Sequence, residues 1–245
     1  MTGVNQNSLA VLAMTNRFVD AGVTPLKASE VWRILAKVEE PSRLLGIDET
    51  DAAEVTAGTG VEAARLVRLL DTGIGLAVQL EALYEQGITT VTVMDETFPH
   101  RLRDRLGTSA PPVLYYAGEV ALLGTDGVGV VGSRNVDSDG VELTREVARQ
   151  VAAAGLSVVS GGARGVDSIS MEAAYAAGGT AVGVLADSLE RAIRNRDNRR
   201  AMLDRQACLC TPYRPDARFS TGTAMGRNKI VYALSRVTLV VASAQ

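Results

Sequence analysis

Glycine, serine and arginine occur together in two short segments, and this combination is typical of sites that bind phosphate. Gly132, Ser133 and Arg134 follow an apolar, β-branched run, and a second glycine-rich segment occupies residues 160–167. Glycine lets the backbone approach a ligand closely, so that N–H groups and a following helix N-terminus face the anion. Arginine adds a forked set of donors that matches phosphate oxygens. The two segments predict binding of a phosphorylated molecule.

The second segment is the more specific of the two, because its glycines permit backbone angles that are closed to other residues. Its candidate binding residues are Ser160, Gly161, Gly162, Arg164 and Gly165. We expect Arg164 to point either at the ligand or into an ion pair with Asp167. We interpret Asp167 itself as a helix N-cap in preference to a catalytic acid.

A third cluster, formed by Arg227, Asn228 and Lys229, is expected to open the last helix of the chain. Cations at a helix N-terminus oppose the helix dipole, so their presence there favours an external anion over a merely solvated helix start. All three clusters follow predicted strands of one parallel sheet. We therefore expect them to converge on a single rim of that sheet.

The charge distribution is uneven along the chain. The net charge is −3 with a pI near 5.4, which argues against a general nucleic-acid binder. Between Arg191 and Arg236, however, eleven arginine or lysine residues stand against three aspartates, so this segment carries +8 and the remainder −11. Such local basicity suits a polyanion held at one face. A solvated helix face explains the charge alone equally well.

Residues suited to covalent catalysis are scarce. His100 is the single histidine and is expected to be structural, and no serine has an evident base partner. Cys208 and Cys210 are interpreted as small residues on one face of a strand, because a zinc site needs about four ligands. The Gly-x-Gly-x-x-Gly match at 127–132 lies within a predicted strand, whereas a dinucleotide fingerprint lies after one. We predict no catalytic residue, no metal and no cofactor, hence a protein that is not an enzyme.

The composition indicates a soluble globular protein, with 47% hydrophobic and 22% charged residues. No apolar run approaches the ~20 residues that span a bilayer, and the N-terminus lacks the pattern of a signal peptide. We therefore expect a cytoplasmic protein without a membrane partner.

Hydrophobic periodicity divides the chain into two parts. Residues 8–70 show helical spacing, whereas strands and helices alternate after Gly118. Strands are expected at 127–132, 156–161, 180–186, 207–213 and 237–243, and helices at 138–154, 167–177, 188–205 and 223–235. This alternation predicts an α/β fold, a Rossmann-like and mostly parallel sheet with helices on both faces, preceded by a small helical domain. The expected domains are 1–73, similar to SAM or helix-hairpin-helix modules, and 74–245.

In order and spacing, five segments resemble the DNA-processing protein A (DprA/Smf) family over nearly the whole chain. The matching segments are residues 97–102, 111–118, 131–134, 160–167 and 227–235. The chain departs from the family pattern at Met171, where a histidine is usual, and in the longer stretch from Phe219 to Arg227. It also stops at Gln245, shortly after a strand that leads in the family to another glycine-rich turn. We expect a divergent or truncated member.

The resemblance implies binding of single-stranded DNA in a basic pocket, without sequence preference and without covalent chemistry. By matching position, the phosphate-holding side chains would be those of Arg134, Arg164, Arg227 and Lys229. The pocket would be shaped by Gly132, Ser133, Gly161 and Gly162. The resemblance also implies a role in natural transformation or recombination, with the RecA recombinase and a second copy of the chain as protein partners.

Two other hypotheses stay open. The first is a nucleotide-binding sensor or a nucleoside-monophosphate phosphoribohydrolase of the same superfamily. Such enzymes need a later Gly-Gly-x-Gly-Thr turn with a glutamate, and nothing after Val241 supplies one. The second is a scaffold whose core has lost its ligand.

Overall fold

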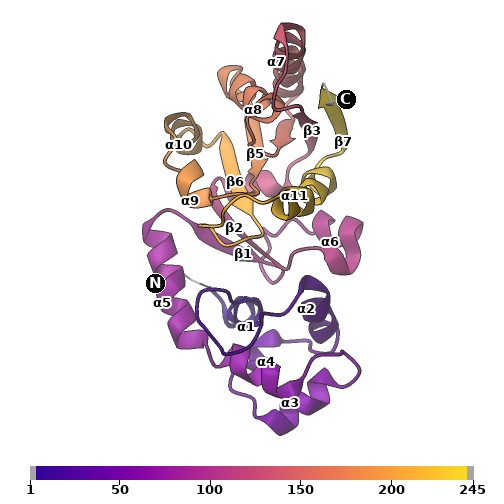
Figure 1. The fold of residues 1–245 in the computed structure, drawn as a ribbon, viewed down its shortest axis with the longest axis vertical. Helices are drawn as coiled ribbons and strands as arrows, with labels where there is room; N and C mark the ends of the chain where they lie inside the picture. Colours follow the sequence, from indigo (N-terminus) through magenta and orange to yellow (C-terminus); the bar gives the residue numbers. More distant parts are fainter. Residues whose placement is uncertain (1–3, 242–245) are drawn as a thin grey trace. The chain divides into compact units, whose positions relative to one another are not determined.

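The computed structural model describes residues 4–241, which form two compact units (Figure 1). The first unit runs to Phe98 and includes Gly107–Leu114. The second comprises Pro99–Leu106 and the chain from Tyr115 onward. No helix within the described residues is long and apolar enough to cross a membrane.

The first unit is mainly helical. Its elements are α1 (Gln6–Met14), α2 (Ala28–Leu35), the 3-10 turn η1 (Pro41–Leu44), α3 (Glu49–Thr56), α4 (Ala63–Leu70), α5 (Gly73–Glu85), β1 (Thr89–Thr92) and the 3-10 turn η2 (Gly107–Ser109). Helix α1 forms the centre of the core, because Ala10 to Met14 are all buried. Side-chain caps start two of the helices, with Asn5 accepting from the Ser8 N–H before α1 and Asp48 accepting from two N–H groups of α3.

The first unit extends beyond the boundary expected at residue 73. Leu76, Leu80 and Leu83 of α5 are buried, and α5 packs against α1 and β1. The Asp95 carboxylate accepts from the Ser8 and Thr92 hydroxyls, which ties α1 to the end of β1. These contacts explain why the compact unit continues through α5 and β1.

Seven strands form one sheet in the order β1-β2-β6-β5-β4-β3-β7. Beyond β1, the strands are β2 (Val113–Gly118), β3 (Gly127–Gly132), β4 (Ser157–Ser160), β5 (Thr180–Val184), β6 (Ala207–Thr211) and β7 (Val237–Val241). The pairs β7/β3, β3/β4, β4/β5 and β5/β6 are parallel, and β2 runs antiparallel to β6. The predicted strands are confirmed to within a few residues, and residues 242 and 243 of the last one lie outside the described range.

Helices of the second unit cover both faces of its sheet (Figure 1). They are α6 (Arg101–Leu106), α7 (Ser138–Ala153), α8 (Val166–Ala176), α9 (Leu189–Ala192), α10 (Arg196–Leu203) and α11 (Thr221–Leu234), with a 3-10 turn η3 (Val120–Gly124). Helix α8 follows β4 and α11 precedes β7, so their crossovers run in opposite directions along the sheet. Right-handed crossovers therefore put these two helices on opposite faces. Chain order therefore reverses at β3, since β4 to β6 lie on one side of it and β7 on the other. This is the predicted Rossmann-like, α/β architecture.

One predicted helix is two helices in the structure. The span expected at 188–205 breaks into α9 and α10, because Asn195 caps a new start by accepting from the N–H groups of Asp197 and Asn198. The pattern of charged residues hides this break, since arginines continue through it.

The glycines of β3 serve strand packing. Gly127, Gly129 and Gly132 all lie within the strand, as expected. A Cβ atom at Gly127 would come within 2.8 Å of the Ser157 carbonyl oxygen, and one at Gly132 within 1.9 Å of the Val241 carbonyl oxygen. The Gly-x-Gly-x-x-Gly match therefore reflects close approach of neighbouring backbones.

Replacing Gly127 by alanine tests this packing role. We expect Gly127→Ala to lower the free energy of unfolding by about 1–3 kcal/mol, because β4 must shift to admit the methyl group. Urea unfolding measures the change. Gly124→Ala is the matched control, since a Cβ atom there would meet no atom within 4 Å. Equal stability of the two variants would show that Gly127 is not needed for the close packing of β3 against β4.

Candidate nucleic-acid interface

A cavity of about 1170 Å³ opens at the carboxyl ends of β3, β4 and β5, where the strand order reverses. Ligands in open α/β sheets bind at this kind of position. The cavity is lined by Val131, Gly132, Ser133, Arg134, Asn135, Gly161, Gly162, Ala163, Arg164, Asp167, Ala186, Asp187, Arg191, Phe219, Ala224, Arg227, Asn228, Tyr232 and Val240. Loops after three different strands therefore meet helix α11 around one space.

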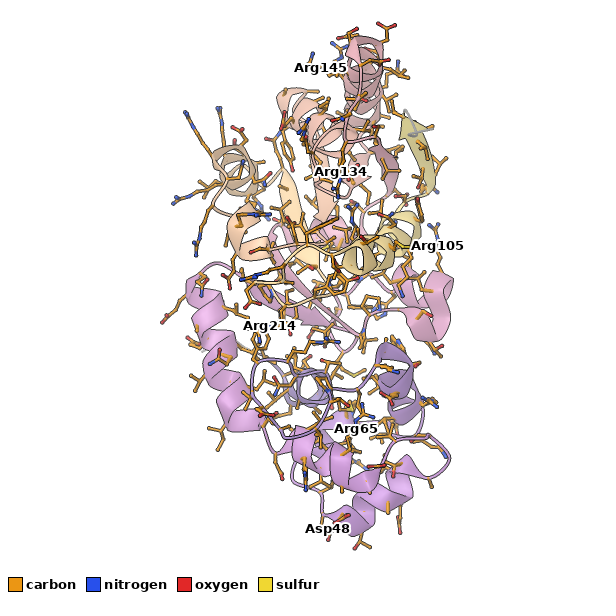
Figure 2. All side chains as sticks on the ribbon, viewed as in Figure 1. Asp48, Arg65, Arg105, Arg134, Arg145 and Arg214 are labelled. Atoms are coloured by element: carbon orange, nitrogen blue, oxygen red, sulfur yellow. The ribbon has the colours of Figure 1, made fainter. Side chains whose placement is uncertain are left out.

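The first loop is held in shape by its own hydrogen bonds. The Ser133 hydroxyl donates to the Asn135 carbonyl oxygen over 2.7 Å and accepts from the Asn135 N–H. The exposed Arg134 guanidinium lies 4.6 Å from the centre of the Phe219 ring. Figure 2 places Arg134 in the middle of the second unit, beside the ends of its strands. The loop thus presents a cation whose position is fixed by an aromatic ring.

The second loop needs its glycines for two different reasons. Gly162 and Gly165 have φ angles of +64° and +89°, which favour glycine. A Cβ atom at Gly161 would fall 1.3 Å from an Arg227 guanidinium nitrogen, so the bare backbone makes room for that side chain. Arg164 donates to the Asn135 side-chain oxygen over 3.1 Å, which links the second loop to the first.

A buried ion pair lies at the base of the cavity. Arg227 Nη1 is 3.4 Å from Asp167 Oδ2, and the two side chains are only 6% and 7% exposed. The same carboxylate accepts from the Ala163 N–H and from the Gly132 N–H. Asp167 therefore connects the end of β3 and the loop after β4 with helix α11.

Burial raises the pKa of the Asp167 carboxyl above its ordinary value, because lost hydration outweighs the Arg227 charge and the N–H donors. Arg227 Nε is buried and has no hydrogen-bond partner among the described residues. The hydrogen-bonding capacity of the pair is thus incompletely used at the cavity base.

One expectation about this pair is wrong, and one of the two alternatives for Arg164 is excluded. Asp167 is not the N-cap of α8, because the cap position belongs to Gly165 and Asp167 lies in the first helical turn. Arg164 does not pair with Asp167, since Arg227 arrives from α11 across the gap beside Gly161. Of the two alternatives, the ion pair is therefore excluded, and Asp167 pairs with a residue 60 positions away in the chain.

The start of the last helix also differs from expectation. Helix α11 begins at Thr221, where Ser220 and Thr223 form a capping box, and Arg227, Asn228 and Lys229 lie in its middle. The argument from cations at a helix N-terminus therefore does not apply to them. Arg227 is buried and Lys229 is exposed, as their positions around the helix require.

The structure brings together eight of the eleven predicted site residues as cavity lining: Gly132, Ser133, Arg134, Gly161, Gly162, Arg164, Arg227 and Asn228. Three do not line it. Ser160 is buried and donates to the Val130 carbonyl oxygen over 2.6 Å, and Gly165 packs against the backbone of the first loop. Lys229 lies on α11 outside the lining.

Sequence reasoning missed several lining residues. Phe219 lies in an irregular stretch before α11. It could have been noticed as an aromatic residue in a chain with only 4% aromatics. Asp187 and Arg191 follow β5 and form an ion pair with each other. Their signal was the polar segment at the carboxyl end of a predicted strand, the same criterion that identified the first two loops.

The cavity presents more accessible positive than negative charge. Its two carboxylates, Asp167 and Asp187, are paired with Arg227 and Arg191. Arg134 and Arg164 are exposed, and neither has a carboxylate partner within the part of the chain that the structure describes. Together with the backbone N–H groups of two glycine-rich loops, this arrangement suits phosphate oxygens.

The sequence profile of the family DNA recombination-mediator protein A matches residues 89–245. The chain belongs to this family. It is 30% identical to the DNA processing protein DprA of Bacillus subtilis over 166 residues, which cover 66% of this chain and 54% of that one. It is 29% identical to the putative DNA processing protein DprA of Mycobacterium tuberculosis over 242 residues, which cover 87% of this chain and 60% of that one. The chain thus spans little more than half the length of these relatives.

Two solved structures share the fold. DprA from Streptococcus pneumoniae aligns with a TM-score of 0.70 at 20% identity, covering 99% of this chain and 79% of that one. DprA from Helicobacter pylori, described for its single-stranded DNA binding mode, aligns with a TM-score of 0.50 at 27% identity, covering 62% and 68%. The predicted family and fold class are confirmed.

A double-mutant cycle on Asp167 and Arg227 tests the buried pair. We expect Asp167→Ala and Arg227→Gln each to lower the free energy of unfolding by about 3–5 kcal/mol, because each leaves one buried group without its partner. The double variant should lose clearly less than the sum of the two. The exposed pair Arg149 and Glu146 is the control and should show a coupling of about 0–1 kcal/mol. Additive losses at Asp167 and Arg227 would show that the two side chains do not stabilise each other.

The stability of the protein should also depend on pH through Asp167. Because its folded pKa is raised, the folded state holds this proton more tightly than the unfolded state, whose pKa is near 3.8. The stabilisation is complete below that value and is lost as the pH rises through the folded pKa. The free energy of unfolding of the wild type, measured with urea, should therefore fall with rising pH relative to that of the double variant. If the stability of the wild type instead rises with pH relative to the double variant, the folded-state pKa of Asp167 is lowered and not raised.

Proposed function

We propose that this protein binds single-stranded DNA without sequence preference and holds its phosphates in the cavity at the strand ends. The observation that carries the proposal is the meeting of Arg134 and Arg164 at one cavity, from loops after two neighbouring strands. Both guanidinium groups are exposed, and the glycine-rich backbone beside them leaves room for a sugar-phosphate chain.

The composition of the lining supports recognition of the backbone over the bases. Arginine side chains and peptide N–H groups contact phosphates, and such contacts carry no sequence information. Phe219 offers a ring on which any base can stack, since every base has a π-face. Tyr232 is a second exposed ring in the lining. Exposed rings beside arginines suit an unpaired strand whose bases are accessible.

Family membership supports the same proposal. The related protein from Helicobacter pylori is described as binding single-stranded DNA, and the relatives from Bacillus and Mycobacterium are named as DNA processing proteins. For this chain we extend the proposal to a cytoplasmic, non-enzymatic role in DNA uptake, natural transformation or recombination. The RecA recombinase and a second copy of the chain are the proposed protein partners.

A small nucleotide is the second candidate ligand. Its support is that the cavity volume of about 1170 Å³ is only slightly above the range, about 300–1,000 Å³, that is usual for small-molecule sites. Cleavage of an N-glycosidic bond is less well supported, because the lining contains no glutamate and each of its two aspartates is paired with an arginine. Binding to nucleoside monophosphates but not to strands would favour this candidate.

Oligonucleotide binding at several salt concentrations tests the proposal. We expect the logarithm of the association constant for a single strand to fall linearly with the logarithm of salt, with a slope near −0.7 for each phosphate contact. Arg134→Gln and Arg164→Gln should each weaken binding to all sequences and reduce the slope by about 0.7. Fluorescence anisotropy measures both quantities.

The exposed Arg145 of α7 provides the control, because it lies outside the cavity lining. Arg145→Gln removes the same charge and should leave the affinity nearly unchanged. An affinity that does not depend on salt concentration, or an equal loss of affinity in all three variants, would count against a phosphate site in this cavity.

A further inference from the structure

Helices α9 and α10 and the turn between them carry a row of exposed arginines: Arg191, Arg194, Arg196, Arg199 and Arg200. Nitrogen-tipped side chains radiate from α10 into the solvent in Figure 2. Of the five, only Arg191 lines the phosphate cavity. The remaining four form a basic surface that the proposed function does not use.

Three of these arginines lack acidic partners. Arg200 lies 3.7 Å from Asp204, and Arg191 is paired with Asp187. Arg194, Arg196 and Arg199 have no carboxylate within 4.0 Å among residues 4–241. We name these three residues the arginine stripe.

The arginine stripe is unfavourable for the helix that carries it. Arg196 opens α10, where a positive charge opposes the helix dipole. Arg196, Arg199 and Arg200 are spaced three and four residues apart, so like charges lie together on one face. A helix arranged in this way gains stability when an external anion binds, which a merely solvated face does not require.

The acidic residue within α10 does not neutralise the stripe. The pKa of Glu172 on α8 is raised by burial and, next in size, by the neighbouring Asp197 carboxylate. Asp197 lines the same cavity as Glu172, and so lies on the side of α10 that faces α8. The helix thus has an acidic inner side and a basic outer side.

A second cavity connects the stripe to the phosphate cavity. It measures about 360 Å³ and shares Gly162, Asp187 and Arg191 with the first cavity. Its other part is lined by Asn195, Asp197 and Asn198 at the start of α10 and by Glu172 of α8. The arginine stripe therefore lies beside the acidic part of this cavity and not within its lining. The hollowed surface therefore continues from the phosphate cavity to the end of α10 that carries Arg196.

We propose that the arginine stripe binds the phosphodiester backbone of the same DNA strand where it leaves the cavity. This inference rests on the proposed function and adds a second contact region that sets the length of strand bound. Its chemistry is that of exposed guanidinium groups on phosphate oxygens, so it adds affinity without adding sequence preference.

The experiment compares oligothymidylates of about 4 and about 16 nucleotides, which bracket the usual site sizes for single-strand binding. A longer strand also offers more registers, so the salt dependence is a better readout than affinity alone. For the wild type, we expect a log–log slope steeper by about 2 for the long strand, since three added contacts contribute about 0.7 each. The variant Arg194→Gln/Arg196→Gln/Arg199→Gln should lose this difference and bind the long strand about tenfold more weakly.

The short strand separates this inference from the proposed function. The triple variant should bind it like the wild type, because the cavity is intact. A matched control replaces three exposed arginines of the first unit, Arg33, Arg43 and Arg68, by glutamine and corrects for net charge. Circular dichroism verifies that α10 remains helical, since glutamine and arginine have similar helix propensities.

The outcomes lead to different conclusions. Equal salt slopes for both lengths, or equal losses in the stripe variant and its control, would overturn the arginine stripe while leaving the cavity proposal in place. Loss of short-strand binding in the triple variant would also overturn it, because the stripe would then act on the cavity itself. Failure of the wild type to bind either length would instead remove the proposed function and this inference with it.

Discussion

The Asp167 carboxylate is the interaction on which the arrangement of the cavity depends. It accepts from the Gly132 N–H at the end of β3, accepts from the loop after β4, and pairs with Arg227 from α11. Three segments far apart in the chain are thereby held to one buried charge. Removing that charge would leave a guanidinium in a site that is 6% exposed, so the carboxylate and the arginine have to be present together.

The sheet supplies the frame for this interaction. Parallel strands β3, β4 and β5 end at the same edge, so the loops that follow them are neighbours whatever their sequence. Glycine at 161 then leaves the space through which Arg227 reaches Asp167, and Gly165 lets the second loop pack on the backbone of the first. The buried pair occupies Arg227, which leaves Arg134 and Arg164 as the cations that face solvent. The same arrangement thus separates structural from ligand-facing arginines.

The sequence predicted the repeating parts of this structure well. Strand and helix periods located β3 to β7 and the helices between them, and the switch from helical to alternating pattern separated the two architectures. The cavity loops were predictable because glycine and arginine at strand ends carry a local signal. Partners that meet only through folding were not predictable: Arg227 with Asp167, and Arg134 with Phe219. The true start of α11 was missed because its cap, Ser220, precedes the basic cluster that attracted attention.

Nuclear magnetic resonance of the backbone amides, recorded while a short single strand is added, tests the central claim most directly. We expect the amides of residues 132–135 and 161–164 to shift together at the same strand concentrations, because both loops contact one phosphate chain. Amides of α7 on the remote part of the second unit should remain in place. Shifts in only one of the two loops, or shifts confined to the helical first unit, would contradict a shared phosphate site.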